Sequence, residues 1–146
     1  MNVAAGALVV ADGKLLLLRR SIDPWRGAWC APGGFCDEGE DLASAVVRET
    51  REEAGIEIEV TGYLGQWVDE YRPGSDEGDD PTYACVSYFH ARVVGEARPQ
   101  ADGVEMSEWG WFEPDALPQP LAPAPGNGAA IYAAWRADLQ SDCSAI

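Results

Sequence analysis

The stretch Gly34–Ile56, GFCDEGEDLASAVVRETREEAGI, decides the fold of this chain. Its second half predicts a helix over Asp41–Ala54, because Asp41 can cap the first turn with a carboxylate and Gly55 can end it in the left-handed conformation. At about 100° per residue, five side chains fall on one stripe of this helix. They are Ala43, Val46, Val47, Thr50 and Ala54. We expect this stripe to face the core.

Three glutamates of the same helix share one face. Glu49, Glu52 and Glu53 follow the spacing i, i+3 and i+4, which brings their side chains together on the helix surface. Clustered carboxylates repel one another by roughly a few tenths of a kcal/mol per exposed pair, and a divalent cation relieves that repulsion. Hard oxygen donors of this kind are what Mg²⁺ prefers. The alternative, a solvated acidic face in an acidic protein, stays open on the helix alone.

The residues before the helix favour the metal site. Gly34 is followed after five residues by Glu40, and after seven more by Arg48-Glu49-Thr50-Arg51-Glu52-Glu53-Ala54-Gly55-Ile56. This spacing resembles the Nudix box, which is Gly, five residues, Glu, seven residues, then Arg-Glu-apolar-any-Glu-Glu-any-Gly-apolar. All seven fixed identities of the box are present. Thr50 stands at an apolar position of the box, where its methyl group can still pack.

The resemblance extends beyond the box, with less specific matches. The flanking matches are Arg19-Arg20, Gly27-Ala28-Trp29, Pro32-Gly33-Gly34-Phe35 and the segment from Glu105 through Phe112. Leu117-Pro118 and Leu121-Ala122 resemble the tail of the ADP-ribose-pyrophosphatase-like branch of the family. The similarity covers roughly Val3 to Ile131.

Strands are expected on both sides of the acidic helix. Val3–Val10 and Lys14–Arg19 predict a hairpin, and the four consecutive leucines Leu15–Leu18 predict that its second strand is buried on both faces. Further strands are predicted over Ala28–Ala31, Ile56–Val60, Tyr63–Tyr71, Tyr83–Val94 and Glu108–Phe112, and a final helix over Asn127–Leu139. The segments Pro32–Gly34, Arg72–Pro81 and Pro114–Pro125 are expected to be a breaker, a mobile loop and an irregular stretch.

Strands interleaved with two helices indicate a sheet between helical layers. The resemblance implies the same architecture, an α+β fold in the form of a Nudix-like α/β/α sandwich with a mixed central β-sheet. The length of 146 residues suits one core. We therefore expect a single Nudix hydrolase domain over residues 1–146.

The composition of the chain indicates which kinds of partner it can bind and in which compartment of the cell it works. The chain has 25 acidic and 10 basic residues, a net charge of −15, so we expect no nucleic-acid partner, whereas a small anionic substrate can bind through metal ions. The four cysteines lack zinc-site spacing, so we expect buried or idle thiols, with a Cys30–Cys36 disulfide as the alternative. The amino-terminal apolar run stops at Asp12 without a basic flank, which favours a cytoplasmic protein without membrane contact.

The resemblance also implies roles for residues of the box. Glu49, Glu52 and Glu53 would hold Mg²⁺, with Mn²⁺ as an alternative metal, and the Gly33 carbonyl would be a further ligand. The general base stays open, with Glu52 and Glu53 ranked before Glu105.

Other residues of the pattern have supporting roles. Glu105, six residues before Trp111, stands where members of the family often have a further acidic ligand or base, and Glu108 is the competitor for that role. Glu40 and Arg48 would brace the loop and orient the glutamates, together with Gly34 and Gly55 as structural positions of the box. The competing interpretation of Arg48 is a surface ion pair with Glu52.

Several residues outside the box are candidates for binding substrate. Arg20 can donate charge-assisted hydrogen bonds to a phosphate, and Arg26 is a weaker candidate. Trp67 and Tyr71 lie near predicted loops and can stack on a base. His90, in a predicted strand, is expected to be structural.

The resemblance implies Mg²⁺-dependent hydrolysis of the pyrophosphate bond in a nucleoside diphosphate linked to another group. ADP-ribose or another nucleotide sugar is favoured by the Arg72–Pro81 insertion and the Leu-Pro and Leu-Ala tail. The alternatives are a sanitising pyrophosphohydrolase of oxidised or non-canonical nucleoside triphosphates, and a catalytically silent nucleotide sensor. Related enzymes are often dimers, so a homodimer is a further expectation.

Overall fold

A hairpin formed by the first twenty residues lies at the centre of the sheet. Strands β1 (Asn2–Ala11) and β2 (Lys14–Arg20) pair antiparallel, with Val10 opposite Leu15, and Gly13 in the turn has a φ of 75°. All four leucines of Leu15–Leu18 are fully buried, as expected. The computed structural model describes residues 1–71, 82–123 and 127–144.

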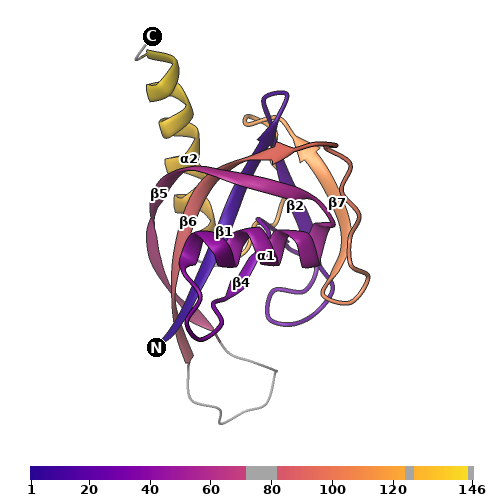
Figure 1. Ribbon diagram of the computed structural model, residues 1–146, viewed down its shortest axis with the longest axis vertical. Helices are drawn as coiled ribbons and strands as arrows, with labels where there is room; N and C mark the ends of the chain where they lie inside the picture. The colour runs from indigo at the N-terminus through magenta and orange to yellow at the C-terminus, as the bar shows by residue number, and fades with distance from the viewer. Residues whose placement is uncertain (72–81, 124–126, 145–146) are drawn as a thin grey trace.

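Seven strands form one mixed sheet in the described residues (Figure 1). The order along its main path is β3 (Trp29–Cys30), β2, β1, β6 (Thr82–Val94) and β5 (Glu57–Tyr71). Two further strands pair beside this path, β4 (Gly33–Phe35) with β1 and β7 (Met106–Phe112) with β2. Strands β1 and β6 run parallel and the other pairs antiparallel, which confirms the predicted mixed sheet.

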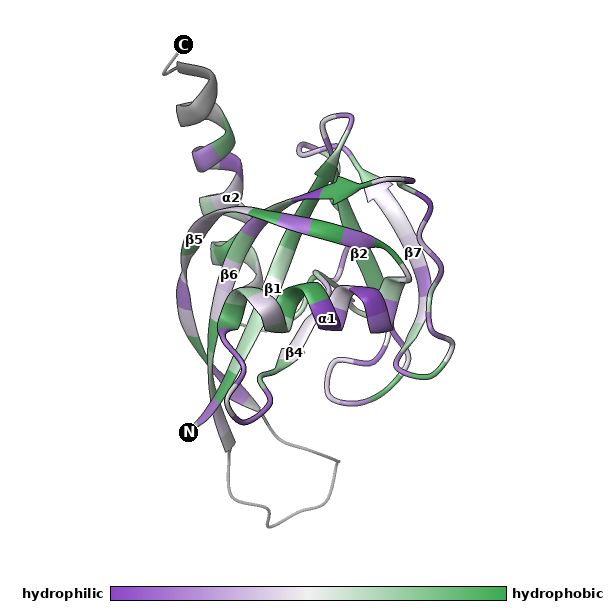
Figure 2. Ribbon diagram, viewed as in Figure 1, coloured by the Kyte–Doolittle hydropathy of each residue, from purple (hydrophilic) through white to green (hydrophobic). Residues whose placement is uncertain are grey.

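The two helices lie on opposite sides of the sheet (Figure 1). Because neighbouring side chains of a strand point to opposite faces, Leu16 and Leu18 pack towards α1 (Leu42–Ala54), whereas Leu15 and Leu17 pack towards α2 (Asn127–Ser144). Figure 2 shows this division, with β2 hydrophobic between the layers and the glutamate-bearing end of α1 hydrophilic. The predicted α/β/α sandwich is therefore confirmed.

Helix α1 begins and ends where the sequence predicts. Asp41 accepts a hydrogen bond from the Ser44 amide at 2.8 Å, and Gly55 closes the helix with a φ of 67°. The predicted apolar stripe was wrong in part, since Ala43 and Val47 are only partly buried, whereas Ala45, outside the predicted stripe, is fully buried. The helix buries five residues: Ala45, Val46, Thr50, Glu53 and Ala54. Helix α1 packs against β4 as well as β1 and β5, and β4 covers the side of the helix that carries Glu53.

The structure differs from the predicted strands at two places. The segments Ile56–Val60 and Tyr63–Tyr71 form one strand, β5, because irregularities in its pairing around Gly62 and Gly65 let it continue past both glycines. Gly33 and Gly34 are not a breaker but part of β4. A Cβ on Gly33 would lie 2.3 Å from the Ala5 carbonyl oxygen, so only glycine lets β4 approach β1 this closely.

The carboxyl-terminal region largely follows the prediction. Helix α2 extends beyond Leu139 to Ser144, and its buried face includes Ile131 and Trp135. Residues 113–123 contain no helix or strand, apart from one bridge between Trp29 and Leu121. The predicted loop Arg72–Pro81 lies outside the described residues.

The structure also bears on the possible disulfide between Cys30 and Cys36 and on whether a helix could span a membrane. Cys30 and Cys36 are both free thiols, so the alternative of a disulfide between them was wrong. Among the residues that the structure describes, no helix has both the length and the apolar character needed to cross a membrane.

Candidate active site

A cavity of about 580 Å³ brings together side chains from both ends of the sequence. Its walls come from β1, β3, β4, β5 and β6, from the carboxyl-terminal half of α1 and from the segments around residues 20–25, 102–106 and 122–123. The acidic side chains on its wall include Glu49, Glu52, Glu53 and Glu105, which the sequence analysis singled out. The structure therefore gathers these four glutamates at one cavity.

Glu53 is the most buried of these glutamates, with only 2% of its surface exposed. Its Oε1 accepts a hydrogen bond from the Gly33 amide at 2.9 Å, whereas its buried Oε2 has no hydrogen-bond partner within the described part of the chain. Burial raises the pKa of the Glu53 carboxyl to about 9, and the nearby Glu49 and Glu105 add to the shift. A buried carboxylate oxygen without a partner is costly, so it calls for a cation or a proton.

Glu49 and Glu52 differ in exposure. The Glu49 side chain is 15% exposed and the Glu52 side chain 57%, so Glu49 lies deeper in the wall. Burial raises the pKa of Glu49, and the guanidinium of Arg48 opposes this shift. A Cβ on Gly34 would lie 2.7 Å from the Glu49 carboxylate carbon. The glycine at this position therefore leaves space for that carboxylate.

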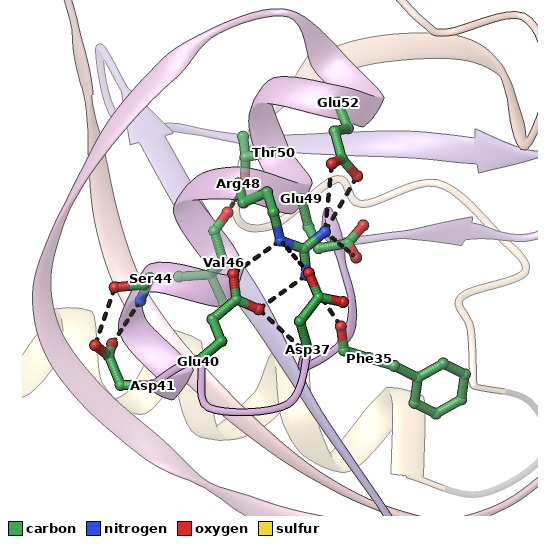
Figure 3. Close-up of polar contacts among 10 residues, drawn as sticks. All are labelled: Phe35, Asp37, Glu40, Asp41, Ser44, Val46, Arg48, Glu49, Thr50 and Glu52. Carbon is green, nitrogen blue, oxygen red and sulfur yellow. Dashed lines mark hydrogen bonds and ion pairs between the residues drawn. The ribbon is translucent and has the colours of Figure 1, made fainter.

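Arg48 joins the glutamates to the loop before the helix (Figure 3). Its Nε donates to Glu40 Oε2 at 2.8 Å and its Nη2 to Glu40 Oε1 at 2.9 Å. Nη1 donates to Glu49 at 3.1 Å and to Glu52 at 3.2 Å, and Nη2 also reaches the Phe35 carbonyl at 3.1 Å. The pair with Glu52 exists, but it is one contact of a network that ties α1 to β4.

Glu40 fixes the loop between β4 and α1. Its Oε1 accepts a hydrogen bond from the Asp37 amide at 3.0 Å, in addition to the two bonds from Arg48. The hydrogen bond from Arg48 is the main reason that the pKa of Glu40 falls to about 2. Glu40 therefore stays ionised near neutral pH and holds Arg48 over Glu49 and Glu52.

Glu105 and Glu108 are separated by the structure. Glu105 lines the cavity, whereas Glu108 pairs with Arg19 at 3.4 Å and does not line it. The turn before Glu105 is held by Asp102, whose Oδ1 accepts bonds from the amides of Val104, Glu105 and Met106 at 2.9, 3.0 and 2.9 Å. This role of Asp102 was not predicted from the sequence, although the pair Asp102-Gly103 is a turn signal.

Of the candidate substrate-binding residues Arg20, Arg26 and Trp67, only Arg20 lines the cavity. Arg20 lines the cavity, donating to the Pro24 carbonyl at 2.7 Å and lying over the Trp25 ring. Arg26 does not line it and pairs with Asp23 at 3.7 Å. Trp67 packs edge-on against Tyr88 in the core under α2, away from the cavity wall.

Tyr71 and His90 both lie on strands of the sheet. Tyr71 ends β5, and its side chain lies outside the described residues. His90 bonds Asp138 of α2 at 2.7 Å, as a structural residue would.

The donor set of the cavity fits a divalent cation. Glu49, Glu52 and Glu53 offer only hard oxygen atoms, and Glu53 Oε2 is buried without a partner in the described residues. In those residues no three acidic side chains converge closely enough to hold an ion as they stand, because Arg48 draws Glu49 and Glu52 onto its guanidinium. A cation bound beside Glu53 would therefore compete with Arg48 for these two carboxylates.

Asp69 is a cavity residue that the sequence analysis did not single out. It lies on β5, lines the cavity and is only 7% exposed. No local pattern marks it, because its position depends on Asn127, which is 58 residues away along the chain.

Comparison with known proteins places these features in context. The family model described as the NUDIX domain matches residues 1–134. An ADP-ribose pyrophosphatase of Methanocaldococcus jannaschii is 31% identical over 117 residues, which cover 80% of this chain and 64% of that protein. An NAD-capped RNA hydrolase NudC of Pseudomonas aeruginosa is 36% identical over 112 residues, which cover 76% of this chain and 36% of that protein. The chain thus spans less than two thirds of the length of both curated relatives.

A solved structure shows the same likeness. The crystal structure of a MutT NUDIX hydrolase from Burkholderia pseudomallei superposes with a TM-score of 0.72 at 32% identity, and the match covers 90% of this chain and 95% of that one. The likeness therefore extends over most of both chains.

Proposed function

This chain belongs to the Nudix family, and we propose that it is a metal-dependent hydrolase of the pyrophosphate bond in a nucleoside diphosphate linked to another group. ADP-ribose or another nucleotide sugar is the proposed substrate. The observation that carries this proposal is the buried Oε2 of Glu53, which has no hydrogen-bond partner among the described residues and lies on a cavity wall that also holds Glu49 and Glu52. Members of the family generally use a divalent metal, and we propose Mg²⁺, with Mn²⁺ as the alternative.

The proposed metal ligands are Glu49, Glu52 and Glu53, with the Gly33 carbonyl as a further one. When bound, the metal would neutralise phosphate oxygens and lower the pKa of water. Glu53 also accepts a hydrogen bond from the Gly33 amide, and this bond fixes its carboxylate against β4. Arg48 and Glu40 act through these glutamates by fixing their rotamers, the kind of support on which metal sites depend.

The general base is proposed among Glu52, Glu53 and Glu105, with Glu52 placed first. Glu52 is half-exposed and can meet a water molecule at the mouth of the cavity. The raised pKa of Glu53, about 9, means that its carboxyl keeps its proton near neutral pH until a cation replaces it. Glu53 therefore suits a ligand better than a base, and Glu105 lies on the same wall without a place in the Arg48 network.

Arg20 is proposed to bind a phosphate of the substrate. It lines the cavity with Glu49, Glu52 and Glu53, and a guanidinium forms strong paired hydrogen bonds with phosphate oxygens. In a chain with a net charge of −15, such a cation on the cavity wall offsets the repulsion of an anionic substrate. The same charge disfavours a nucleic-acid substrate.

A second candidate is the hydrolysis of oxidised or non-canonical nucleoside triphosphates, the alternative substrate class left open by the sequence. The two candidates need the same metal site and differ in the group beyond the second phosphate.

A substrate panel with product identification tests the proposal. We expect ADP-ribose to yield AMP and ribose 5-phosphate in the presence of Mg²⁺ or Mn²⁺, faster than any triphosphate reacts. Faster release of pyrophosphate from an oxidised deoxynucleoside triphosphate would favour the second candidate. Binding without turnover by the folded protein would instead indicate a nucleotide sensor.

A further inference from the structure

Asp69 is a buried acidic side chain that the proposed metal chemistry does not use. It lies on β5 opposite Ala84 of β6 and bonds to Asn127 at the start of α2. Since α1 and α2 lie on opposite sides of the sheet (Figure 1), Asp69 is on the far side of the sheet from the helix that carries the glutamates. The same cavity nevertheless includes both.

Asn127 sets the orientation of the Asp69 carboxylate. Its Nδ2 donates to Asp69 Oδ1 at 2.6 Å and to the Val68 carbonyl at 2.8 Å, so both hydrogens of the amide are used. Within residues 1–71, 82–123 and 127–144, Asn127 is the side chain that bonds to this carboxylate. A carboxylate can accept about four hydrogen bonds. Asp69 therefore keeps acceptor capacity for a ligand in the cavity.

The surroundings of Asp69 suit the nucleoside end of a substrate. Ala84, which pairs with Asp69, and Val86 and Tyr88 further along β6 also line the cavity, so this part of the wall is less polar than the part that carries the glutamates. Its negative charge repels phosphate groups, which are drawn instead to Arg20 and to cations held by the helix glutamates. A substrate that spans the cavity would therefore place its phosphates near α1 and its nucleoside near Asp69.

The hydrogen bond from Asn127 does not require a charged side chain at position 69. An uncharged amide or hydroxyl oxygen can accept the same hydrogen bond, without the cost of burying a carboxylate. Burial also raises the pKa of Asp69, and the bond from Asn127 opposes the shift. A buried carboxylate on a cavity wall, with a neutral partner on one oxygen, is suited to accept hydrogen bonds from a ligand.

We propose that Asp69 is a specificity-determining residue whose carboxylate accepts hydrogen bonds from two neighbouring N–H or O–H donors on the nucleoside end of the substrate. This inference rests on the proposed pyrophosphohydrolase function and narrows its substrate class. Two parts of a nucleotide offer such paired donors. One is a purine edge with a ring N–H beside an amino group, and the other is the cis-diol of a ribose.

The first test removes donors from the substrate and leaves the protein unchanged. Two series of nucleoside diphosphate sugars are compared. The first varies the base among guanine, hypoxanthine and adenine, and the second varies the sugar attached to the base among ribose, 2′-deoxyribose and 3′-deoxyribose. Loss of a hydrogen bond to a charged group is expected to lower kcat/KM roughly 10- to 100-fold, chiefly through KM. A loss from guanine to hypoxanthine assigns Asp69 to the base, and a loss on deoxygenation assigns it to the ribose.

The second test is Asp69→Asn, which keeps the size of the side chain and replaces one acceptor by a donor. We expect this variant to lose roughly 10- to 100-fold in kcat/KM for the preferred substrate, with kcat much less affected. It should also respond little to the donor deletions that impair the unchanged protein. Glu59→Gln is the matched control, because Glu59 is an exposed residue of the same strand that pairs with Arg92 outside the cavity.

The outcomes separate this inference from the proposed function. If the unchanged protein hydrolyses all analogues equally well, or if Asp69→Asn lowers kcat/KM for all of them by one factor, Asp69 does not determine specificity, and the hydrolase proposal stands. If nothing is hydrolysed, the hydrolase proposal fails. Calorimetric binding of the same analogues then tests Asp69, and equal affinities for parent and donor-deleted nucleotides would overturn its role.

Discussion

The guanidinium of Arg48 donates two parallel hydrogen bonds, of 2.8 and 2.9 Å, to the carboxylate of Glu40. The third nitrogen of the guanidinium remains directed at Glu49 and Glu52. Glu40 thus controls, through Arg48, where two of the proposed metal ligands lie. A residue one loop away from the metal site can therefore affect activity without touching metal or substrate.

Glu40→Gln tests this relationship. The amide keeps the size of the side chain but loses the paired, charge-assisted bonds, and we expect turnover to fall about 10- to 100-fold, as for other residues that orient metal ligands. Arg48→Lys should behave similarly, because an ammonium group cannot reach all of these partners in a fixed plane. Steady-state kinetics with saturating metal measure the effect.

Glu57→Gln is the control for this prediction. It breaks an ion pair with Arg51 on the same helix, in which both side chains are half-exposed, and such pairs contribute about 0–1 kcal/mol. Its turnover should be that of the unchanged protein. Equal activities of the Glu40 and Glu57 variants would show that the bonds to Arg48 do not orient the site.

The two glycines of β4 predict opposite outcomes for the same substitution. A Cβ on Gly34 would lie 2.7 Å from the flexible end of Glu49, whereas a Cβ on Gly33 would lie 2.3 Å from the backbone oxygen of Ala5. Gly34→Ala should therefore keep the fold but displace the Glu49 carboxylate, lowering turnover at least about tenfold. Gly33→Ala should separate β4 from β1 and lower the free energy of unfolding by about 1–3 kcal/mol or more.

Thermal unfolding and kinetics on both glycine variants separate these effects. We expect Gly34→Ala to lose activity with a nearly unchanged melting temperature, and Gly33→Ala to show a lower melting temperature. A Gly34 variant that is fully active would mean that Glu49 can move without consequence, and would remove it from the proposed ligands.

Local patterns explain which parts of the fold could be predicted. The caps at Asp41 and Gly55 and the buried run Leu15–Leu18 depend on neighbouring residues, and the structure confirms them. The burial of Glu53 could not be predicted from helix periodicity, because it depends on the close approach of β4. The periodicity placed an apolar stripe on the helix but contained no information about which strand would cover its edge.

The candidate site was predictable where one segment supplies it. The glutamates of α1 and their partner Glu40 lie within a short stretch, and the spacing of the Nudix box singled them out. Asp69 and Asn127 come from distant segments, so no spacing marks them. Trp67 was expected to stack on a base, but the register of β5 turns it towards Tyr88 in the core, and a one-residue shift in register would reverse this.

Glu53 makes the stability of the metal-free protein depend on pH. Its pKa is about 9 in the folded chain, against an ordinary value of 4.5. Between these values the unfolded chain has lost the proton that the folded chain keeps, so the free energy of unfolding falls as pH rises, by at most about 1.4 kcal/mol per pH unit. Urea unfolding in the presence of a chelator, from pH 5 to pH 8.5, measures this slope.

Glu53→Gln supplies the comparison for the pH dependence. The amide cannot ionise, so the variant should gain stability relative to the unchanged protein as pH rises, and the difference should be largest near pH 8.5. Glu59→Gln, which removes an exposed carboxylate paired with Arg92, should follow the unchanged protein. Parallel profiles for the Glu53 variant and the unchanged protein would show that Glu53 is ionised in the folded chain.

Added metal should reverse the effect of pH on stability. A cation bound to Glu49, Glu52 and Glu53 stabilises the folded chain by about 2.7 kcal/mol at one hundred times its dissociation constant. Because the cation competes with the proton on Glu53, this gain should be larger at pH 8.5 than at pH 6. The rise in melting temperature with Mg²⁺, measured at both pH values, tests the site without any substrate.

Non-specific screening is the competing cause of such a rise, since the chain has a net charge of −15. Sodium chloride at matched ionic strength measures that screening, and Glu53→Gln should respond to Mg²⁺ no more than it responds to sodium. Glu59→Gln should keep the full response of the unchanged protein. If the Glu53 variant gained as much from Mg²⁺ as the unchanged protein, the cation would be acting on the general acidic surface, and the helix glutamates would not form its site.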